Sequence, residues 1–87
     1  MQFQGTVLEG DRVVVHDVQG TYQFDSAAGP SISWSGRMSV PAGAAIPDGE
    51  TYTLRLTDGR ERTITVSGGT YTDAGGTVWF RGKGRAP

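Results

Sequence analysis

The sequence contains no cysteine, a single histidine and no long run of apolar residues. Without cysteine, the chain has no disulfide framework, no thiolate nucleophile and no thiolate ligand for a metal ion. No stretch approaches the about 18 apolar residues of a membrane-spanning helix, and the first residues lack the basic and apolar regions of a secretion signal. We therefore expect a soluble, cytoplasmic protein that does not contact a membrane.

The residue combinations of common catalytic sites are also missing. His16 is followed by Asp17, but adjacent residues of a strand point to opposite faces, so Asp17 cannot orient His16 as in a nucleophilic triad. The chain has no Gly-x-Ser-x-Gly motif and no glycine loop with the lysine of a phosphate site. We expect a protein that is not an enzyme and holds no metal and no cofactor. A small hydrolase or lyase with a cleft at His16 is the less favoured alternative.

Length and glycine content limit the architecture. The 87 residues suffice for one hydrophobic core, so we expect a single domain over residues 1–87, with residues 83–87 as a flexible tail. The chain has eight aromatic residues and 14 glycines, and glycine is more than twice its usual share of about 7%. Since the hydrophobic fraction of 36% is high enough to fold, we interpret the glycines as turns and strand bends.

The segment 31–40 alternates apolar and polar residues without a break. Ile32, Trp34, Met38 and Val40 fall on one side, and serines and an arginine fall on the other. This period of two is typical of a half-buried β-strand, whereas a helix would scatter the apolar side chains. Gly36 lies on the apolar side, where a missing side chain leaves room for a bulky neighbour or for a bend.

The segments 50–57 and 60–66 predict the clearest hairpin. With a two-residue Asp58-Gly59 turn, Ile64 would point away from Tyr52 and its apolar neighbours. A three-residue turn that ends on a left-handed Gly59 instead pairs Leu56 with Arg60 and Tyr52 with Ile64. We therefore predict the three-residue turn, because it brings the apolar residues together.

The remaining segments give a less uniform pattern. Residues 3–8 and 12–18 predict a first hairpin. A two-residue loop in it pairs Val7 and its alternating neighbours with the face of Val14 and Val18, and a three-residue loop pairs them with the face of Val13 and Val15. Gly20 interrupts the pattern, so residues 21–25 are predicted as a short third strand. Residues 67–76 are predicted as a loop with at most a short strand, and Ile46 is expected to plug one end of the core.

Three strands carry an aromatic residue and a glycine two positions apart: Phe3-Gln-Gly5, Trp34-Ser-Gly36 and Phe80-Arg-Gly82. Such pairs either pack each ring over a neighbour's glycine or mark bends that close a barrel. Together these patterns predict an all-β fold, a small antiparallel β-barrel or two-layer β-roll of about six to seven strands without substantial helix.

The charges are unevenly distributed although the net charge is only −1. Residues 1–50 carry six acidic and two basic residues, a net charge of −4, and residues 51–87 carry three acidic and six basic residues, a net charge of +3. Such a difference arises either from a basic face that meets an anion or from two halves that attract each other, within the fold or between copies of the chain.

The last strand carries the strongest candidate binding surface. Trp79, Arg81, Lys83 and Arg85 alternate onto the face opposite Val78 and Phe80, and an aromatic side chain followed by three cations can stack a base and hold phosphates. Arg60 and Arg62 would enlarge the surface if they lay beside it. The alternative is structural, because terminal strands commonly carry charges that block edge pairing.

The sequence therefore favours a non-catalytic module that acts through protein–protein contacts or self-association. The alternative is binding of single-stranded nucleic acid or another polyanion by the Trp79, Arg81 and Lys83 face. We expect a protein partner or a homo-oligomer, with nucleic acid as the second class of partner.

Overall fold

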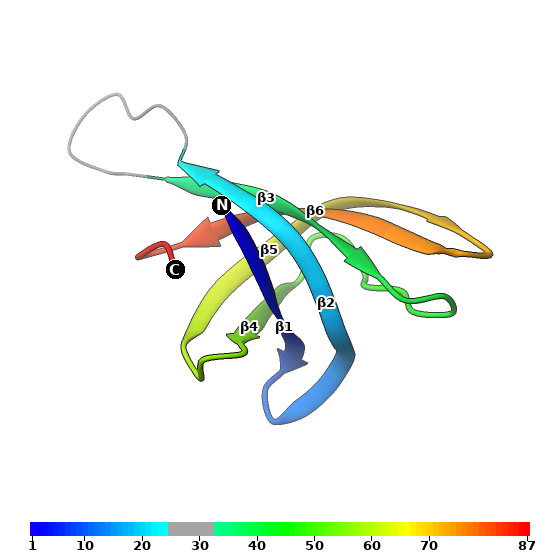
Figure 1. Ribbon diagram of the computed structural model, residues 1–87, viewed down its shortest axis with the longest axis horizontal. Coiled ribbons are helices and arrows are strands. Elements are labelled where there is room, and N and C mark those ends of the chain that lie inside the picture. The colour runs from blue at the N-terminus through cyan, green and yellow to red at the C-terminus, as the bar shows by residue number, and fades with distance from the viewer. Residues whose placement is uncertain (25–32) are drawn as a thin grey trace.

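The computed structural model describes residues 1–24 and 33–87 of the chain. These residues form the strands β1 (Gln2–Glu9), β2 (Arg12–Phe24), β3 (Trp34–Val40), β4 (Thr51–Leu56), β5 (Glu61–Thr72) and β6 (Gly75–Lys83). The strands close into an antiparallel barrel in the order β1-β2-β3-β6-β5-β4 (Figure 1). The part of the chain that the structure describes contains no helix. The predicted small all-β fold is confirmed, in its barrel form.

The barrel consists of two three-stranded meanders, β1–β2–β3 and β4–β5–β6. The segment 41–50 links them along the chain, and they meet at two seams, where β1 pairs with β4 and β3 pairs with β6. Figure 1 also shows the β5–β6 hairpin reaching beyond the body of the barrel. Because side chains alternate along each strand, one face of every strand points into a common interior.

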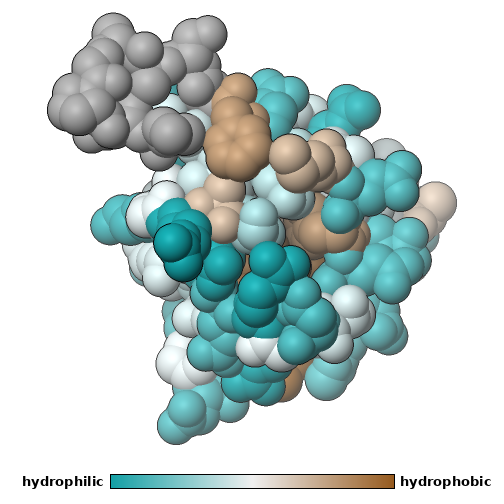
Figure 2. All heavy atoms as spheres, turned by 60° about the vertical axis from the view of Figure 1, so that its left-hand side comes forward, coloured by the Kyte–Doolittle hydropathy of each residue, from teal (hydrophilic) through white to brown (hydrophobic). Residues whose placement is uncertain are grey.

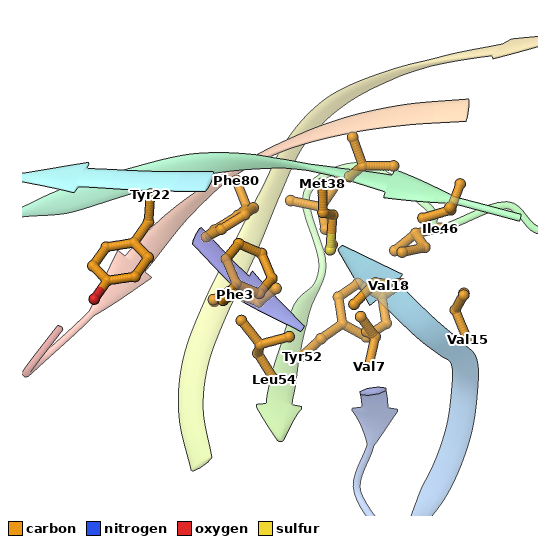
Figure 3. Close-up of a cluster of buried hydrophobic side chains, with 14 of the residues drawn as sticks. Phe3, Val7, Val15, Val18, Tyr22, Met38, Ile46, Tyr52, Leu54 and Phe80 are labelled. Carbon is orange, nitrogen blue, oxygen red and sulfur yellow. The ribbon is translucent and has the colours of Figure 1, made fainter. Parts of the chain in front are cut away.

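That interior is filled by apolar side chains from all six strands and from the linking segment (Figure 3). The predicted alternation of segment 31–40 is confirmed over β3, while Ile32 lies outside the described residues. The cluster consists of Phe3, Val7, Val15, Val18, Tyr22, Trp34, Met38, Val40, Ile46, Tyr52, Leu54, Leu56, Ile64, Val66, Val78 and Phe80.

Aromatic rings in this core lie over glycines of neighbouring strands. Trp34 lies against Gly82, Phe80 against Gly36 and Phe3 against Gly20, so that a Cβ atom on Gly36 would be 2.7 Å from Phe80 Cζ. Outside the cluster, Tyr71 lies in the same way against Gly76, its cross-strand partner. The expected packing of rings over glycine is thus confirmed at Gly36 and Gly82. Gly5 serves another purpose, because the backbone of Arg55 in β4 occupies the position of its missing side chain.

The rings also contact one another. Phe3, Tyr22, Trp34 and Phe80 form a closed cycle of four, with ring centroids 5.9 to 6.4 Å apart and mostly edge-to-face arrangements. Such pairs contribute about 0.5–1.5 kcal/mol each beyond the burial of their area. This cycle joins β1, β2, β3 and β6 and fills one half of the barrel interior.

The predicted register of the β4–β5 hairpin is confirmed. Tyr52 pairs with Ile64, Gly59 has the positive φ of 94°, and the amide of Leu56 donates to the carbonyl of Arg60 at 2.8 Å. Ile46 plugs the core as expected, with 2% of its surface exposed. The hydroxyl of Tyr71 donates to the Ile46 carbonyl and accepts from the Ile46 amide, which fixes the linking segment against the β5–β6 hairpin.

Two predicted strand boundaries were wrong, both because of glycines. Residues 12–24 form one strand rather than two, since Gly20 continues β2 and makes room for Phe3 and for the backbone of β3. Residues 67–76 are not one loop, because β5 continues through Thr72 and β6 begins at Gly75, which leaves only Asp73 and Ala74 as a turn. In both places glycine accommodates a ring within a strand instead of ending the strand.

Neither of the two uniform registers proposed for the first hairpin is found. The loop has two residues and Leu8 pairs with Val13, but Val7 then pairs with Val15 and Gly5 with Val18. These shifts insert extra residues into β2, and one of them is Asp17, with a positive φ of 58°. The bulges bring Val15 and Val18 into the core together with Val7.

The ring-over-glycine packing predicts a large loss of stability in Gly82→Ala. The new methyl group would overlap the indole of Trp34, and overpacking of this kind costs about 1–3 kcal/mol. Gly68→Ala is the matched control, because no atom lies within 4 Å of the place that its Cβ atom would take and its backbone is not left-handed. Urea denaturation of both variants measures the difference, and equal stabilities would contradict this account of the core.

Candidate functional site

Four side chains form a basic and aromatic strip on the outside of the β3–β6 seam. Trp79, Arg81 and Lys83 point outward from β6, and Arg37 lies directly across from Trp79 on β3. The indole of Trp79 is 43% exposed, although its neighbours Val78 and Phe80 are buried. We call Arg37, Trp79, Arg81 and Lys83 the Trp79 strip. The structure thus brings three of the five predicted site residues together and adds Arg37.

Within the described part of the chain, the cations of the Trp79 strip have no close counter-charge. The ion pairs among the described residues are Arg12–Glu9, Arg55–Glu61 and Arg60–Asp58. Glu61 is the only acidic residue in β3, β5 or β6, and Arg55 already neutralises it at 2.8 Å. The strip therefore presents three positive charges that are available to an external anion.

A hollow lies beside the Trp79 ring. It is bounded by Trp79 and by hydroxyl-bearing residues, Ser39 of β3, Thr70 of β5 and Thr77 of β6, together with the small residues of the β5–β6 turn. Across β5, the partner of Trp79 is Gly68, which has no side chain to cover the indole. A flat ligand group can therefore approach the ring, with hydroxyl groups beside it as hydrogen-bond partners.

Arg60 and Arg62 do not join this surface. Arg62 follows the same side of β5 as Ile64, so it points to the inner side of the barrel, at the end where Phe24 and the last residues lie. Arg60 and Arg62 line a groove there with Phe24, Gly84, Arg85, Ala86 and Pro87, which we call the mouth groove. Figure 2 brings this end of the molecule forward and shows apolar atoms exposed among hydrophilic ones.

Arg60 is held by Asp58 within the hairpin turn. One Asp58 carboxylate oxygen accepts from the Arg60 amide at 3.0 Å, and the other accepts from Arg60 Nε at 2.7 Å. The hydrogen bond from the Arg60 amide, together with the contact to its guanidinium, lowers the pKa of Asp58 below its usual value. Asp58 therefore stays ionised at neutral pH and fixes Arg60 at the rim of the mouth groove.

The residues considered for other chemistry lie apart from both surfaces. His16 is exposed on β2, next to the left-handed Asp17. No group of three metal-ligating side chains occurs in residues 1–24 and 33–87. None of the segments that the structure describes is a helix of the length and apolarity needed to cross a membrane.

The acidic and basic parts of the sequence correspond to the two meanders. The change of sign between residues 50 and 51 falls where the linking segment enters β4, so β1–β3 belong to the acidic part and β4–β6 to the basic part. Each of the three ion pairs of the described residues lies within one part, and none crosses between them. Within the strands of the first meander, however, Glu9 and Asp17 are balanced by Arg12 and Arg37, so β1–β3 themselves carry no acidic excess.

Comparisons with known proteins found no relative of this chain: no family model, no curated protein and no solved structure matches it.

Two residues of these surfaces, Arg37 and Phe24, did not emerge as candidates from the sequence, and a third, Arg85, is predicted beside Trp79 but lies in the mouth groove. Arg37 lies on the polar side of the segment 31–40, but only the pairing of β3 with β6 places it next to Trp79. Arg85 follows Gly84, whose φ of 72° turns the chain after β6 and brings Arg85 to the mouth groove. Phe24 was assigned to a separate short strand, so no signal connected it with the arginines.

The lowered pKa of Asp58 predicts a pH dependence of stability that Asp58→Asn removes. The folded pKa lies below the unfolded value, so ionised Asp58 stabilises the fold above about pH 4. That contribution is lost as the pH falls through the folded pKa. Thermal denaturation gives the melting temperatures of the unchanged protein and of Asp58→Asn between neutral and strongly acidic pH. The difference between the two melting temperatures should become smaller in acid. A difference that does not change with pH would mean that the carboxylate charge is not what holds Arg60.

Proposed function

We propose that the protein is a non-catalytic binding module and that its Trp79 strip binds single-stranded nucleic acid. The observation that carries the proposal is the exposure of Trp79 beside three cations that lack a counter-charge among the described residues. Bases of any sequence can stack on an exposed indole, and cations along the strand can hold the phosphates. The strip follows a strand, which suits an extended ligand.

The arrangement also indicates how the ligand would lie. Successive outward side chains of a strand are about 6.6 Å apart, so Trp79, Arg81 and Lys83 extend over about 13 Å of β6. Arg37 lies across the seam from Trp79, so that cations flank the indole along β6 and across to β3. A single strand that follows β6 would therefore stack one base on Trp79 and place neighbouring phosphates near Arg81 and Lys83.

The slightly acidic net charge of −1 does not conflict with this proposal. Electrostatic attraction over short distances depends on the local charge, because salt screens exposed charges beyond about 8–10 Å. The acidic residues without an ion pair in the described part lie in β2 and in turns and linking segments, not on the outer face of β3, β6 and β5. The proposal includes a cytoplasmic location. The chain has no cysteine and therefore needs no disulfide bond, which suits a reducing compartment such as the cytoplasm.

Removal of single side chains from the Trp79 strip should weaken binding in two distinct ways. Trp79→Ala removes the stacking platform, worth about 1–3 kcal/mol per base, and should weaken binding roughly 5- to 150-fold at every salt concentration. Arg81→Ala removes one phosphate contact and should reduce the slope of log affinity against log salt by about 0.7. Fluorescence anisotropy with a labelled oligothymidylate of about 12 nucleotides measures both effects.

Arg12→Ala is the matched control for the cation, because Arg12 is also an exposed strand residue but lies far along the chain at the start of β2. Its affinity and salt slope should equal those of the unchanged protein. Absence of binding to the oligonucleotide at low salt would exclude the proposal. Equal binding of heparin and of the oligonucleotide, with no loss in Trp79→Ala, would mean that only charge is recognised.

A second candidate function, self-association, is favoured by the open edge of β5. Strand β4 covers β5 only from Glu61 to Thr65, and Val66 is bonded to residues of the linking segment. In the described part of the chain, residues 67–72 pair with β6 alone. This edge contains neither a charge nor a proline, the features by which soluble proteins usually block edge pairing. A second copy could therefore add its own residues 67–72 in an antiparallel arrangement around a two-fold axis.

Thr70→Lys places a charge on that edge and should shift a dimer to a monomer. Ser39→Lys is the matched control, because Ser39 is equally exposed but pairs on both sides, with Gln19 and Thr77. Light scattering over a range of protein concentrations gives the mass of each variant. A protein that remains monomeric at all concentrations, or a dimer that both lysines disrupt alike, would exclude association through β5.

A further inference from the structure

The mouth groove gathers three arginines at one end of the barrel, next to the Lys83 end of the Trp79 strip. Its volume is about 640 Å³, within the range of small-molecule sites. Arg60 comes from the β4–β5 turn, Arg62 from the start of β5 and Arg85 from the segment after β6. Segments that are distant in the sequence thus converge, so the cluster is not a consequence of a local charge run.

The charges of the mouth groove are not balanced. Asp58 neutralises Arg60, whereas neither Arg62 nor Arg85 has an ion pair within the described residues. The side chains of Asp58, Arg60, Arg62 and Arg85 together therefore carry a charge of +2. A groove with this excess favours an anion of two negative charges over one with a single charge.

Arg62 adds an observation that points to a missing acceptor. Its Nη1 atom donates to the carbonyl of Glu61 at 2.8 Å, but its Nε atom is buried and has no hydrogen-bond partner in residues 1–24 and 33–87. A buried donor without a partner costs about 1–3 kcal/mol. The indole Nε1 of Trp34, which lies over Gly82 at the same end of the barrel, is the other buried side-chain donor without a partner in these residues. Of these two residues only Arg62 lines the mouth groove, so an oxygen-bearing ligand there would lie beside a guanidinium that lacks an acceptor.

The groove also has an aromatic side. Phe24 is 51% exposed, and its ring contacts that of Tyr22 edge to face, with centroids 6.4 Å apart. The Tyr22 hydroxyl donates to the carbonyl of Pro87 at 3.1 Å, which fixes the last residues beside the groove. Phe24 therefore offers an exposed ring, supported from behind, next to the cluster of guanidinium groups.

We infer that the mouth groove is a binding site for a small aromatic phosphate monoester. Its phosphate would lie among Arg60, Arg62 and Arg85, because the guanidinium fork matches phosphate oxygens and a monoester carries about −1.5 to −2 charges at neutral pH. The aromatic part would lie against Phe24. This site does not depend on the Trp79 strip, and either surface can bind its ligand without the other.

Phenyl phosphate is the simplest probe of this combination. Titration followed by ¹H–¹⁵N NMR should move the amide signals of Phe24, Arg62 and Arg85 and leave that of Trp79 in place. Benzoate, which has one charge, and inorganic phosphate, which has no ring, should each bind at least about tenfold more weakly. Equal binding of all three would mean an adventitious contact of ions with arginine, and shifts confined to the Trp79 strip would overturn the assignment.

Two variants test the residues in opposite directions. Arg62→Met combined with Arg85→Ala keeps an apolar stem over the core and should weaken phenyl phosphate binding at least about tenfold. Asp58→Asn keeps the oxygen that accepts from the Arg60 amide but removes the competing charge, and should strengthen binding about three- to fivefold.

Arg81→Ala serves as the control and should bind phenyl phosphate like the unchanged protein. Thermal denaturation shows whether the double variant Arg62→Met, Arg85→Ala is folded. If it is unfolded, Asp58→Asn still tests the site, because its binding is expected to become stronger. Weaker or unchanged binding in Asp58→Asn would overturn the inference. If the unchanged protein binds phenyl phosphate but does not bind the oligonucleotide, the proposed function is refuted and this site stands.

Discussion

The contact of an aromatic ring with the bare backbone of a glycine on the next strand is the constraint on which this barrel depends. Trp34 over Gly82, Phe80 over Gly36 and Phe3 over Gly20 repeat the same arrangement around the interior. A small barrel has room for few large side chains, and each ring can lie flat against its wall only where no Cβ atom projects. Gly20, Gly36 and Gly82 therefore belong to the construction of the core, while other glycines provide positive φ angles in turns.

The alternation of large apolar residues was sufficient to predict the fold class and much of the interior. It placed Trp34, Phe80 and Ile64 inside, and together with the left-handed Gly59 it gave the correct register of the β4–β5 hairpin. The predictions failed where glycine was read as an interruption, at Gly20 and in residues 67–76. The sequence of those strands does not state which ring a glycine faces, because that ring belongs to another strand and its position depends on the closed barrel.

The candidate site could be predicted only along single strands. The outward alternation of Trp79, Arg81 and Lys83 follows from the pattern of β6 alone. The neighbours of that strip follow from strand order, which is why Arg37 was missed and why Arg60 and Arg62 were grouped with residues that they do not approach. The bulge at Asp17 had no local signal either, since aspartate adopts a positive φ there without the glycine that usually marks one.

Because the interior of the barrel is filled, it leaves no room for a ligand-binding cavity at its centre. Apolar side chains occupy the centre of the barrel, so a ligand must be met on the outer face of a strand or at an end. The outer face of the β3–β6 seam offers an indole and cations, and the end near Phe24 offers a ring and guanidinium groups. Both surfaces combine an aromatic ring with cations, one along a strand and the other in an open groove at the end of the barrel.

The division into two meanders has a consequence for how the chain assembles. Cleavage of the backbone between β3 and β4 would produce an acidic fragment and a basic fragment, each with two strand edges that only the other fragment satisfies. The rings of Trp34 and Phe80, each packed on a glycine of the other fragment, would hold the two fragments in register. The two meanders therefore contact each other along two seams as the subunits of a dimer do, and the segment 41–50 is the covalent link between them.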